Sequence, residues 1–233
     1  METKIKEIQD ILIEMLYIDF EVDETFPFIV SHPIFQYCAV NYIKDGEDVL
    51  IDITEASKEE YEEVLDFYEN QIRNTDNINH LLMFVAKPYK SAFFKLIYEL
   101  LSEEDYAEML RTIWQECEQP NYKNKAISVP QFLKFFKKAK KEYLMTKSEM
   151  IAYDDIFEPL TVYRGYYSEK MYPALSWTTD RLVAEFFASR FSNGVVYKAT
   201  IDKKYIVAMF DYENEVILDY KKLQNIEKIK RAD

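Results

Sequence analysis

The stretch from 160 to 219 constrains the fold of this chain most, because it joins short β-like runs that each carry polar chemistry at one edge. Three runs read Leu-Thr-Val-Tyr-Arg-Gly at 160–165, Leu-Ser-Trp-Thr-Thr-Asp at 175–180 and Tyr-Glu-Asn-Glu-Val-Ile-Leu-Asp at 212–219. Side chains that alternate with a period of two are typical of strands. These runs predict a sheet that presents an arginine, a serine and a pair of glutamates.

The last run predicts two neighbouring carboxylates. In a strand, Glu213 and Glu215 would share one face with Ile217, while Val216 and Leu218 would point to the other. A carboxylate beside another carboxylate has its protonated form favoured, and a sheltered one can stabilise a positive charge that develops in a transition state. The alternative for an isolated Glu-x-Glu is a solvated strand face.

The ordered set of Arg164, then Ser176-Trp177-Thr178, then Glu213-Asn214-Glu215 resembles the Arg-Ser-Glu group of mono-ADP-ribosyltransferases, in the bacterial-toxin and phage-like branch. In that family the arginine ends one strand, a Ser-x-Thr/Ser motif opens the next, and a Glu-x-Glu motif begins a later strand. The resemblance covers residues 155 to 225. The bulky Trp177 departs from the usual Ser-Thr-Ser, which implies a remodelled nicotinamide pocket or a degenerate site.

The resemblance implies a split β-sandwich with NAD, the co-substrate, in the cleft between its sheets. Glu215 would bind the ribose hydroxyl and stabilise an oxocarbenium-like transition state, and Glu213 would orient or deprotonate the nucleophile. Arg164 would hold the phosphate or ribose end of NAD, and the Ser176 hydroxyl would tie the catalytic glutamate into place. The resemblance implies no metal. The residues that would contact NAD are Tyr163, Arg164, Gly165, Ser176, Trp177, Thr178 and Phe187.

The function implied is transfer of ADP-ribose to a macromolecule, with a protein as the target. A glutamate at the first position of the Glu-x-Glu motif favours arginine as the acceptor. Two other functions stay open: NAD hydrolysis by a toxin that depletes NAD, and a non-catalytic module that binds NAD or protein. A nucleic-acid acceptor is a weaker variant that rests on the lysines of the predicted helix 128–145.

Each motif also has a structural interpretation. Arg164 could pair with a carboxylate and pin its strand, and Thr178, Thr179 or Asp180 could cap the helix that follows. That helix would turn Val183, Phe186, Phe187 and Phe191 toward the core, as most aromatic residues at helical spacing do. Glycine at 165 would let the strand end in a sharp turn and bring a ligand close to the backbone.

The first two thirds of the chain are predicted to be mainly helical, so the fold class is α+β. Apolar residues recur at helical spacing in residues 4–18, and capping boxes precede helices at Ser57 and Ser128. An Asp45-Gly46 turn between β-prone runs predicts a hairpin over 36–53. We expect a helical region over 1–153 and the core that resembles the ADP-ribosyltransferases over 154–233.

Composition indicates a globular protein that acts in the cytoplasm, with delivery into another cell left open. The net charge is −13 and the pI is near 4.8, so a nucleic-acid partner would need a local basic patch. Cys38 and Cys117 show no metal-ligand spacing. The start of the chain lacks the apolar core of a signal peptide, and no apolar run is long enough to span a bilayer, so no membrane partner is expected.

Overall fold

A computed structural model describes residues 1–116, 126–167 and 174–229, and places the chain in two compact units. Unit 1 is 1–126 and unit 2 is 127–233. The division falls earlier in the chain than the expected one at 153–154, because the helices of 129–154 pack on the sheet that follows them. The expected α+β class is confirmed: helices dominate the N-terminal part, and a large antiparallel sheet follows.

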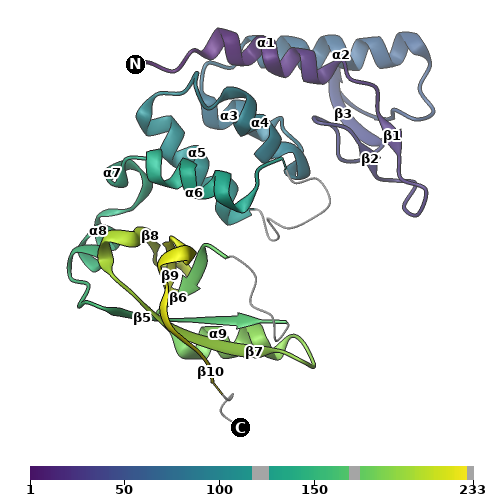
Figure 1. Ribbon diagram of the computed structural model, residues 1–233. Helices are drawn as coiled ribbons and strands as arrows, with labels where there is room; N and C mark the ends of the chain where they lie inside the picture. The colour runs from purple at the N-terminus through teal and green to yellow at the C-terminus, as the bar shows by residue number, and fades with distance from the viewer. Residues whose placement is uncertain (117–125, 168–173, 230–233) are drawn as a thin grey trace. The chain divides into compact units, whose positions relative to one another are not determined.

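Unit 1 is built from helices with two small two-stranded sheets (Figure 1). Its helix α1 buries Ile8, Leu12 and Leu16, and the capping box at Ser57 starts α2 as expected. The elements are α1 Ile5–Leu16, β1 Glu21–Val22, β2 Val30–Ser31, β3 Ala39–Lys44, β4 Glu47–Asp52, α2 Lys58–Arg73, α3 Ile78–Met83, η1 Lys87–Tyr89, α4 Lys90–Ile97 and α5 Glu103–Glu116.

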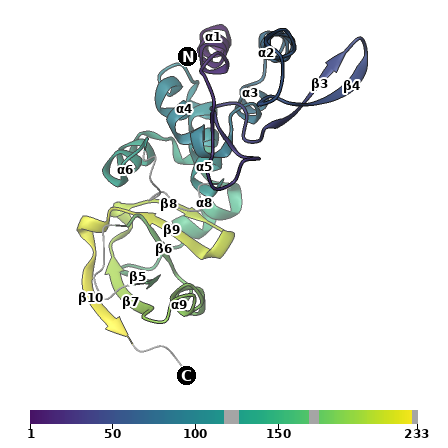
Figure 2. The same cartoon turned by 90° about the vertical axis from the view of Figure 1, so that its right-hand side faces the viewer.

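The predicted hairpin is confirmed as β3 and β4, which extend away from the neighbouring helices in Figure 2. Asp45 and Gly46 both have positive φ, 52° and 84°, which a tight two-residue hairpin turn requires. Val40 and Tyr42 are buried on one face, where Tyr42 donates to Glu63 of α2. Cys38, one of the two cysteines of the chain, is buried beside this hairpin. The second, Cys117, lies outside the described residues.

A buried histidine holds the turn that follows β2. His32 is fully buried, and its Nδ1 accepts hydrogen bonds from the backbone N–H groups of Ile34 and Phe35, both at 3.0 Å. Its ring stacks on that of Phe35, with centroids 4.8 Å apart. Because Nδ1 accepts two N–H groups, the turn requires the neutral imidazole.

Unit 2 begins with three helices, α6 Val129–Lys138, α7 Lys141–Leu144 and α8 Lys147–Asp154. The Ser128 capping box is confirmed, but one continuous helix to residue 145 is not, because Ala139 adopts an extended conformation with ψ of 138°. Ala139, at this break, and Leu144, in α7, are both buried. Within the described residues, none of the helices combines the length and apolar character needed to cross a membrane.

The rest of unit 2 is a six-stranded antiparallel sheet with the order β10-β7-β5-β6-β9-β8 (Figures 1 and 2). Among the described residues, one Cα pair, Tyr163 opposite Thr178, joins β5 to β6, whereas seven pairs join β5 to β7. The elements are β5 Leu160–Tyr166, β6 Ser176–Thr178, α9 Arg181–Ser189, β7 Val195–Ile201, η2 Lys203–Tyr205, β8 Ile206–Phe210, η3 Tyr212–Asn214, β9 Glu215–Leu218, η4 Tyr220–Lys222 and β10 Gln224–Ile229.

The two faces of this sheet are covered differently. One core cluster contains residues from both halves of the sheet, including Val162 and Tyr197 from one half and Trp177 and Val216 from the other. Because one apolar cluster collects side chains from β5, β6, β7 and β9, the two three-stranded halves share a single core. The opposite face of β5 and β7 is covered by α9, Arg181–Ser189.

Helix α9 lies against the sheet through its small residues and not through its aromatic ones. Ala184 and Ala188 have no exposed surface, whereas the expected core residues Phe186 and Phe191 are 57% and 48% exposed. A Cβ atom at Gly165 would lie 2.7 Å from Ala188 N and closer still to Ala184 O, so the helix backbone occupies the space above this glycine. The strand also continues through Gly165 to Tyr166 and does not end in a turn there.

We predict that Gly165→Ala destabilises unit 2 by about 3 kcal/mol or more, because the added methyl group meets helix backbone that cannot move aside as a side chain would. The matched control is Gly46→Ala, which meets no atom within 4 Å but adopts a φ of 84°, so its cost is conformational and about 1 kcal/mol. Urea unfolding of both variants would measure the difference. Equal costs for the two substitutions would contradict the close approach of α9.

We predict that unit 1 loses stability as the pH falls below the ordinary histidine pKa because of His32. Burial lowers the pKa of His32, opposed by the backbone carbonyls of Ile18 and Leu16. The unfolded chain therefore binds the proton more tightly, and stability is complete above about pH 6.5 and is lost as the pH falls further. His32→Asn keeps an acceptor for the turn without titrating. Calorimetry should give a flatter profile of Tm against pH for the variant; parallel profiles would contradict the role of His32.

Candidate active site

Arg164 lies near the end of β5, on the face that carries the shared core. Its Nη1 donates to the backbone carbonyl of Ser176, and its guanidinium carbon is 5.7 Å from the centroid of the Tyr166 ring. The Nε atom is buried and has no hydrogen-bond partner among the described residues. Burial lowers the pKa of Arg164, and the charges of Tyr166 and Glu215 raise it. A guanidinium with an unused buried donor is ready to bind an anionic group.

The sheet places the three expected strands side by side. β6, which begins with Ser176, lies between β5 and β9, which begins with Glu215. Thr178 is opposite Tyr163 on one side and opposite Glu215 on the other, so these three side chains share the face that α9 covers in part. Arg164 leaves the sheet from the other face, and the charge of Glu215 raises its pKa.

The hydroxyl that ties the glutamate segment belongs to Thr178, not to Ser176 as the resemblance implied. Thr178 Oγ1 donates to the Glu213 carbonyl at 2.8 Å and accepts from the Asp180 N–H at 3.0 Å. Ser176 is opposite Ile217, two residues beyond Glu215. Asp180, one of three expected caps, accepts from the Leu182 N–H and caps α9.

The sequence predicted that Glu213 and Glu215 share one face of a single strand, and this prediction is wrong. The strand begins at Glu215, and Glu213 and Asn214 adopt left-handed conformations with φ of 59° and 48°. Left-handed backbone is costly for a glutamate, so it requires support from its surroundings. These two residues form a bend at 211–214, so the Glu213 side chain does not follow the alternation of side chains along β9. Both glutamates are half-buried.

Arg190 also belongs to this site, although it was not among the residues predicted from the sequence. Its guanidinium carbon lies 4.7 Å from the Phe186 ring centroid and 4.6 Å from that of Phe187. Burial raises the pKa of Glu213, and the charge of Arg190 acts in the opposite direction. The signal was present as an arginine three residues after an aromatic residue at the end of a helix. The charge of Arg190 thus lowers the pKa of Glu213, and the charge of Glu215 raises the pKa of Arg164.

The aromatic residues expected to stack on nicotinamide occupy three different environments. Trp177 is 3% exposed within the shared core, and its indole N–H donates to the Ala174 carbonyl, so its ring is a packing element. Tyr163 is half-buried and packs against the cluster beneath α9. Phe187 is half-buried, and the guanidinium of Arg190 lies over its ring. Phe187 is therefore the candidate whose ring contacts a charged group.

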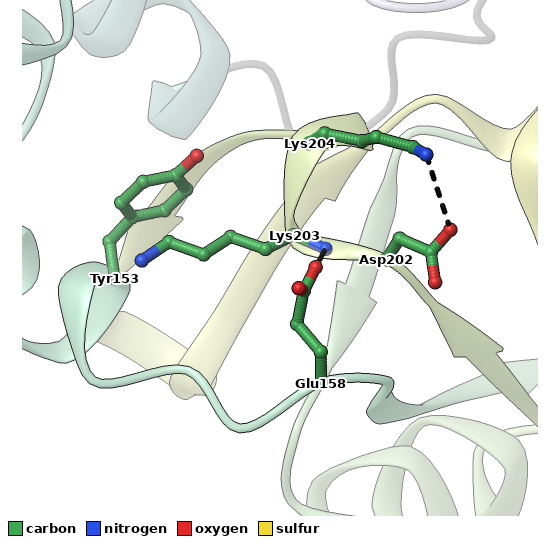
Figure 3. Close-up of a pocket in the computed structure, with 5 residues that line it drawn as sticks. All are labelled: Tyr153, Glu158, Asp202, Lys203 and Lys204. Carbon is green, nitrogen blue, oxygen red and sulfur yellow. Dashed lines mark hydrogen bonds and ion pairs between the residues drawn. The ribbon is translucent and has the colours of Figure 1, made fainter.

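An open cavity of about 560 Å³ lies elsewhere in unit 2, lined by Tyr153, Glu158, Asp202, Lys203 and Lys204 (Figure 3). The carboxylates that line it have partners within the cavity: Glu158 accepts from the backbone N–H of Lys203 at 2.6 Å, and Asp202 lies 3.9 Å from the Lys204 ammonium. The Lys203 ammonium donates to the Asp154 carbonyl and lies over the Tyr153 ring. These contacts join α8 to the ends of β5 and β7, which is a structural role.

The acidity of the chain is confined to unit 1. Unit 1 has 27 acidic and 11 basic residues, and unit 2 has 15 acidic and 18 basic residues, which gives net charges of −16 and +3. The candidate site therefore lies in a unit whose overall charge does not repel an anionic nucleotide. Within the described residues, no group of three histidine, cysteine, aspartate or glutamate side chains could hold a metal ion.

We predict that Glu213→Gln raises the thermal stability of unit 2 slightly at pH 7, and that the gain disappears at acidic pH. Because the folded pKa of Glu213 is raised, its contribution to stability is complete below the ordinary glutamate pKa and is lost as the pH rises through the folded value. Glutamine does not titrate. The control is Glu227→Gln, which removes an exposed partner of Lys198. A difference in Tm that does not depend on pH would contradict the prediction.

No protein-family model, no curated protein and no solved structure matches this chain.

Proposed function

We propose that unit 2 is the core of an NAD-dependent mono-ADP-ribosyltransferase that modifies a protein, with an arginine side chain favoured as the acceptor. The observation that carries this proposal is the position of three strands. β5, β6 and β9 bear Arg164, Ser176 and Glu215, and they are neighbours in the sheet although β7 and β8 intervene in the sequence. Arg164 and Glu215 leave this part of the sheet from opposite faces, and the charge of Glu215 raises the pKa of Arg164.

The arrangement of the sheet supports a split β-sandwich. The junction of β5 and β6, where one backbone pair joins the two halves among the described residues, separates Arg164 from Glu215. The Nε of Arg164, which has no hydrogen-bond partner among the described residues, suits a phosphate oxygen, and Arg190 offers a second cation whose charge acts on Glu213. Phe187, under Arg190, offers an aromatic face for a planar ring.

The chemistry is a displacement at the anomeric carbon of the nicotinamide ribose. The bond from this carbon to nicotinamide breaks, and its electron pair leaves with the nicotinamide nitrogen. The sugar passes through an oxocarbenium-like state, which the carboxylate of Glu215 stabilises as carboxylates do in glycosidases. The acceptor nitrogen then forms its bond to the carbon and gives up a proton.

Glu213 is the candidate base for that proton. Burial raises its pKa toward the range in which a carboxylate accepts protons more readily, and the left-handed bend sets it apart from Glu215. Protein arginine carries a positive charge, so a carboxylate is also the group that would hold it in place. Glu213 therefore acts on the acceptor while Glu215 acts on the sugar.

Incubation of the protein with NAD labelled in its adenylate portion, with and without a cell extract, tests the proposal. Label on protein, sensitive to reagents that cleave arginine-linked ADP-ribose, supports it. Free ADP-ribose without labelled protein would replace it with NAD hydrolysis, and label on nucleic acid would change the acceptor class. Intact NAD in every reaction would support a non-catalytic module.

We predict that Glu215→Gln lowers NAD turnover by about a hundredfold or more, because it removes the charge that stabilises the transition state and keeps the shape of the side chain. The thermal transition should change little, since Glu215 is half-buried at a strand end. Glu227→Gln, an exposed glutamate on β10 of the same sheet, is the matched control and should keep full turnover. Full turnover by Glu215→Gln would remove Glu215 from the mechanism.

A further inference from the structure

We propose that Glu149, in helix α8, is a positioning residue that holds the bend at 211–214 and thereby sets the geometry of Glu213 and Glu215. The inference rests on the proposed function for its catalytic consequence, while the structural contact can be tested separately. Glu149 lies in the segment expected to belong to the helical N-terminal region, and unit 2 contains it.

The Glu149 carboxylate is buried and accepts hydrogen bonds from two separate parts of the chain. The residue is 1% exposed. Its Oε2 accepts from the Thr146 N–H at 2.7 Å, which completes the capping box of α8, and its Oε1 accepts from the Asp211 N–H at 2.9 Å. A buried carboxylate bound to backbone N–H groups forms short, strong hydrogen bonds, so it fixes both segments relative to one another.

Asp211 is the first residue of the bend that carries the two glutamates. Its carbonyl accepts from the Asn214 N–H at 3.2 Å, and its carboxylate accepts from the Ser148 hydroxyl of α8 at 3.0 Å. The far side of the bend is held by the end of β6, where Thr178 binds the Glu213 carbonyl and the Thr179 N–H donates to the Asn214 carbonyl. α8 and β6 therefore hold the bend from its two ends.

This double support matches the cost of the bend. Two consecutive residues other than glycine, Glu213 and Asn214, have positive φ. Such conformations are strained for residues that carry a side chain, and they persist only when neighbouring contacts fix them. If the contact to Asp211 is lost, the bend is free to relax toward ordinary backbone conformations, and both carboxylates move.

A second capping box in the same unit shows why residue 149 is a glutamate. In α6, Gln131 at the corresponding position accepts from the Ser128 N–H at 2.9 Å, so glutamine is sufficient for a capping box here. Glutamine has one acceptor oxygen and glutamate has two. The second oxygen of Glu149 is used for Asp211, which lies 62 residues away in the sequence.

The test is Glu149→Gln, which leaves one acceptor for two N–H groups. The positioning role predicts that kcat for NAD cleavage falls by on the order of tenfold to a hundredfold with little change in KM, because small displacements of catalytic groups carry such costs. Amide hydrogen exchange at Asn214 should become faster. The matched control is Glu60→Gln, which makes the same change in the α2 capping box.

This control should lower Tm slightly and leave kcat and the exchange of Asn214 unchanged. Wild-type kcat and wild-type exchange at Asn214 in Glu149→Gln would overturn the proposal, as would an equal loss of kcat in Glu60→Gln. If the wild-type protein cleaves no NAD, the proposed function fails, and exchange at Asn214 in Glu149→Gln still decides whether Glu149 holds the bend.

Discussion

The backbone pair between Tyr163 and Thr178, which alone joins β5 to β6 among the described residues, is the contact on which the candidate site depends. It joins the two halves of the sheet, and it lies in the same row as Glu215. Because β6 has three residues, a small change in its register would move Ser176 and Thr178 relative to both neighbours. The contacts of Thr178 with Glu213 and Asp180 extend this row into the bend on one side and the α9 cap on the other.

Electrostatics give the site two different carboxylates. The charge of Glu215 raises the pKa of Arg164 across the sheet, whereas burial raises the pKa of Glu213 and the charge of Arg190 lowers it. Pairs of titratable groups in unlike environments are how active sites divide acid, base and charge-stabilising roles. The chemistry proposed for unit 2 needs such a division, since one group acts on a developing cation and the other on a proton.

The helices of 129–154 contact the strands that lead to the candidate site. Lys137 of α6 forms an ion pair with buried Asp219 after β9, and Lys141 of α7 donates to the Ile206 carbonyl at the start of β8. Glu149 of α8 binds the N–H of Asp211 between β8 and β9. These three contacts hold the hairpin of β8 and β9 at its start, its middle and its end, which explains why the boundary between the units precedes the helices.

The sequence by itself determined the elements: the α+β class, the hairpin at Asp45-Gly46, the capping boxes and the strands around Arg164, Ser176 and Glu215 follow from local periodicity and from caps, which depend on neighbours in the chain. Tertiary structure decided the rest. Helix α9 faces the sheet with its alanines and not with its phenylalanines, because Gly165 lets the backbones of the helix and the strand approach closely. Trp177 fills a core that is built from strands distant in the sequence. The bend at Glu213, the position of Arg190 and the contact from Glu149 to Asp211 depend on groups far apart in the sequence, and only folding brings such groups together.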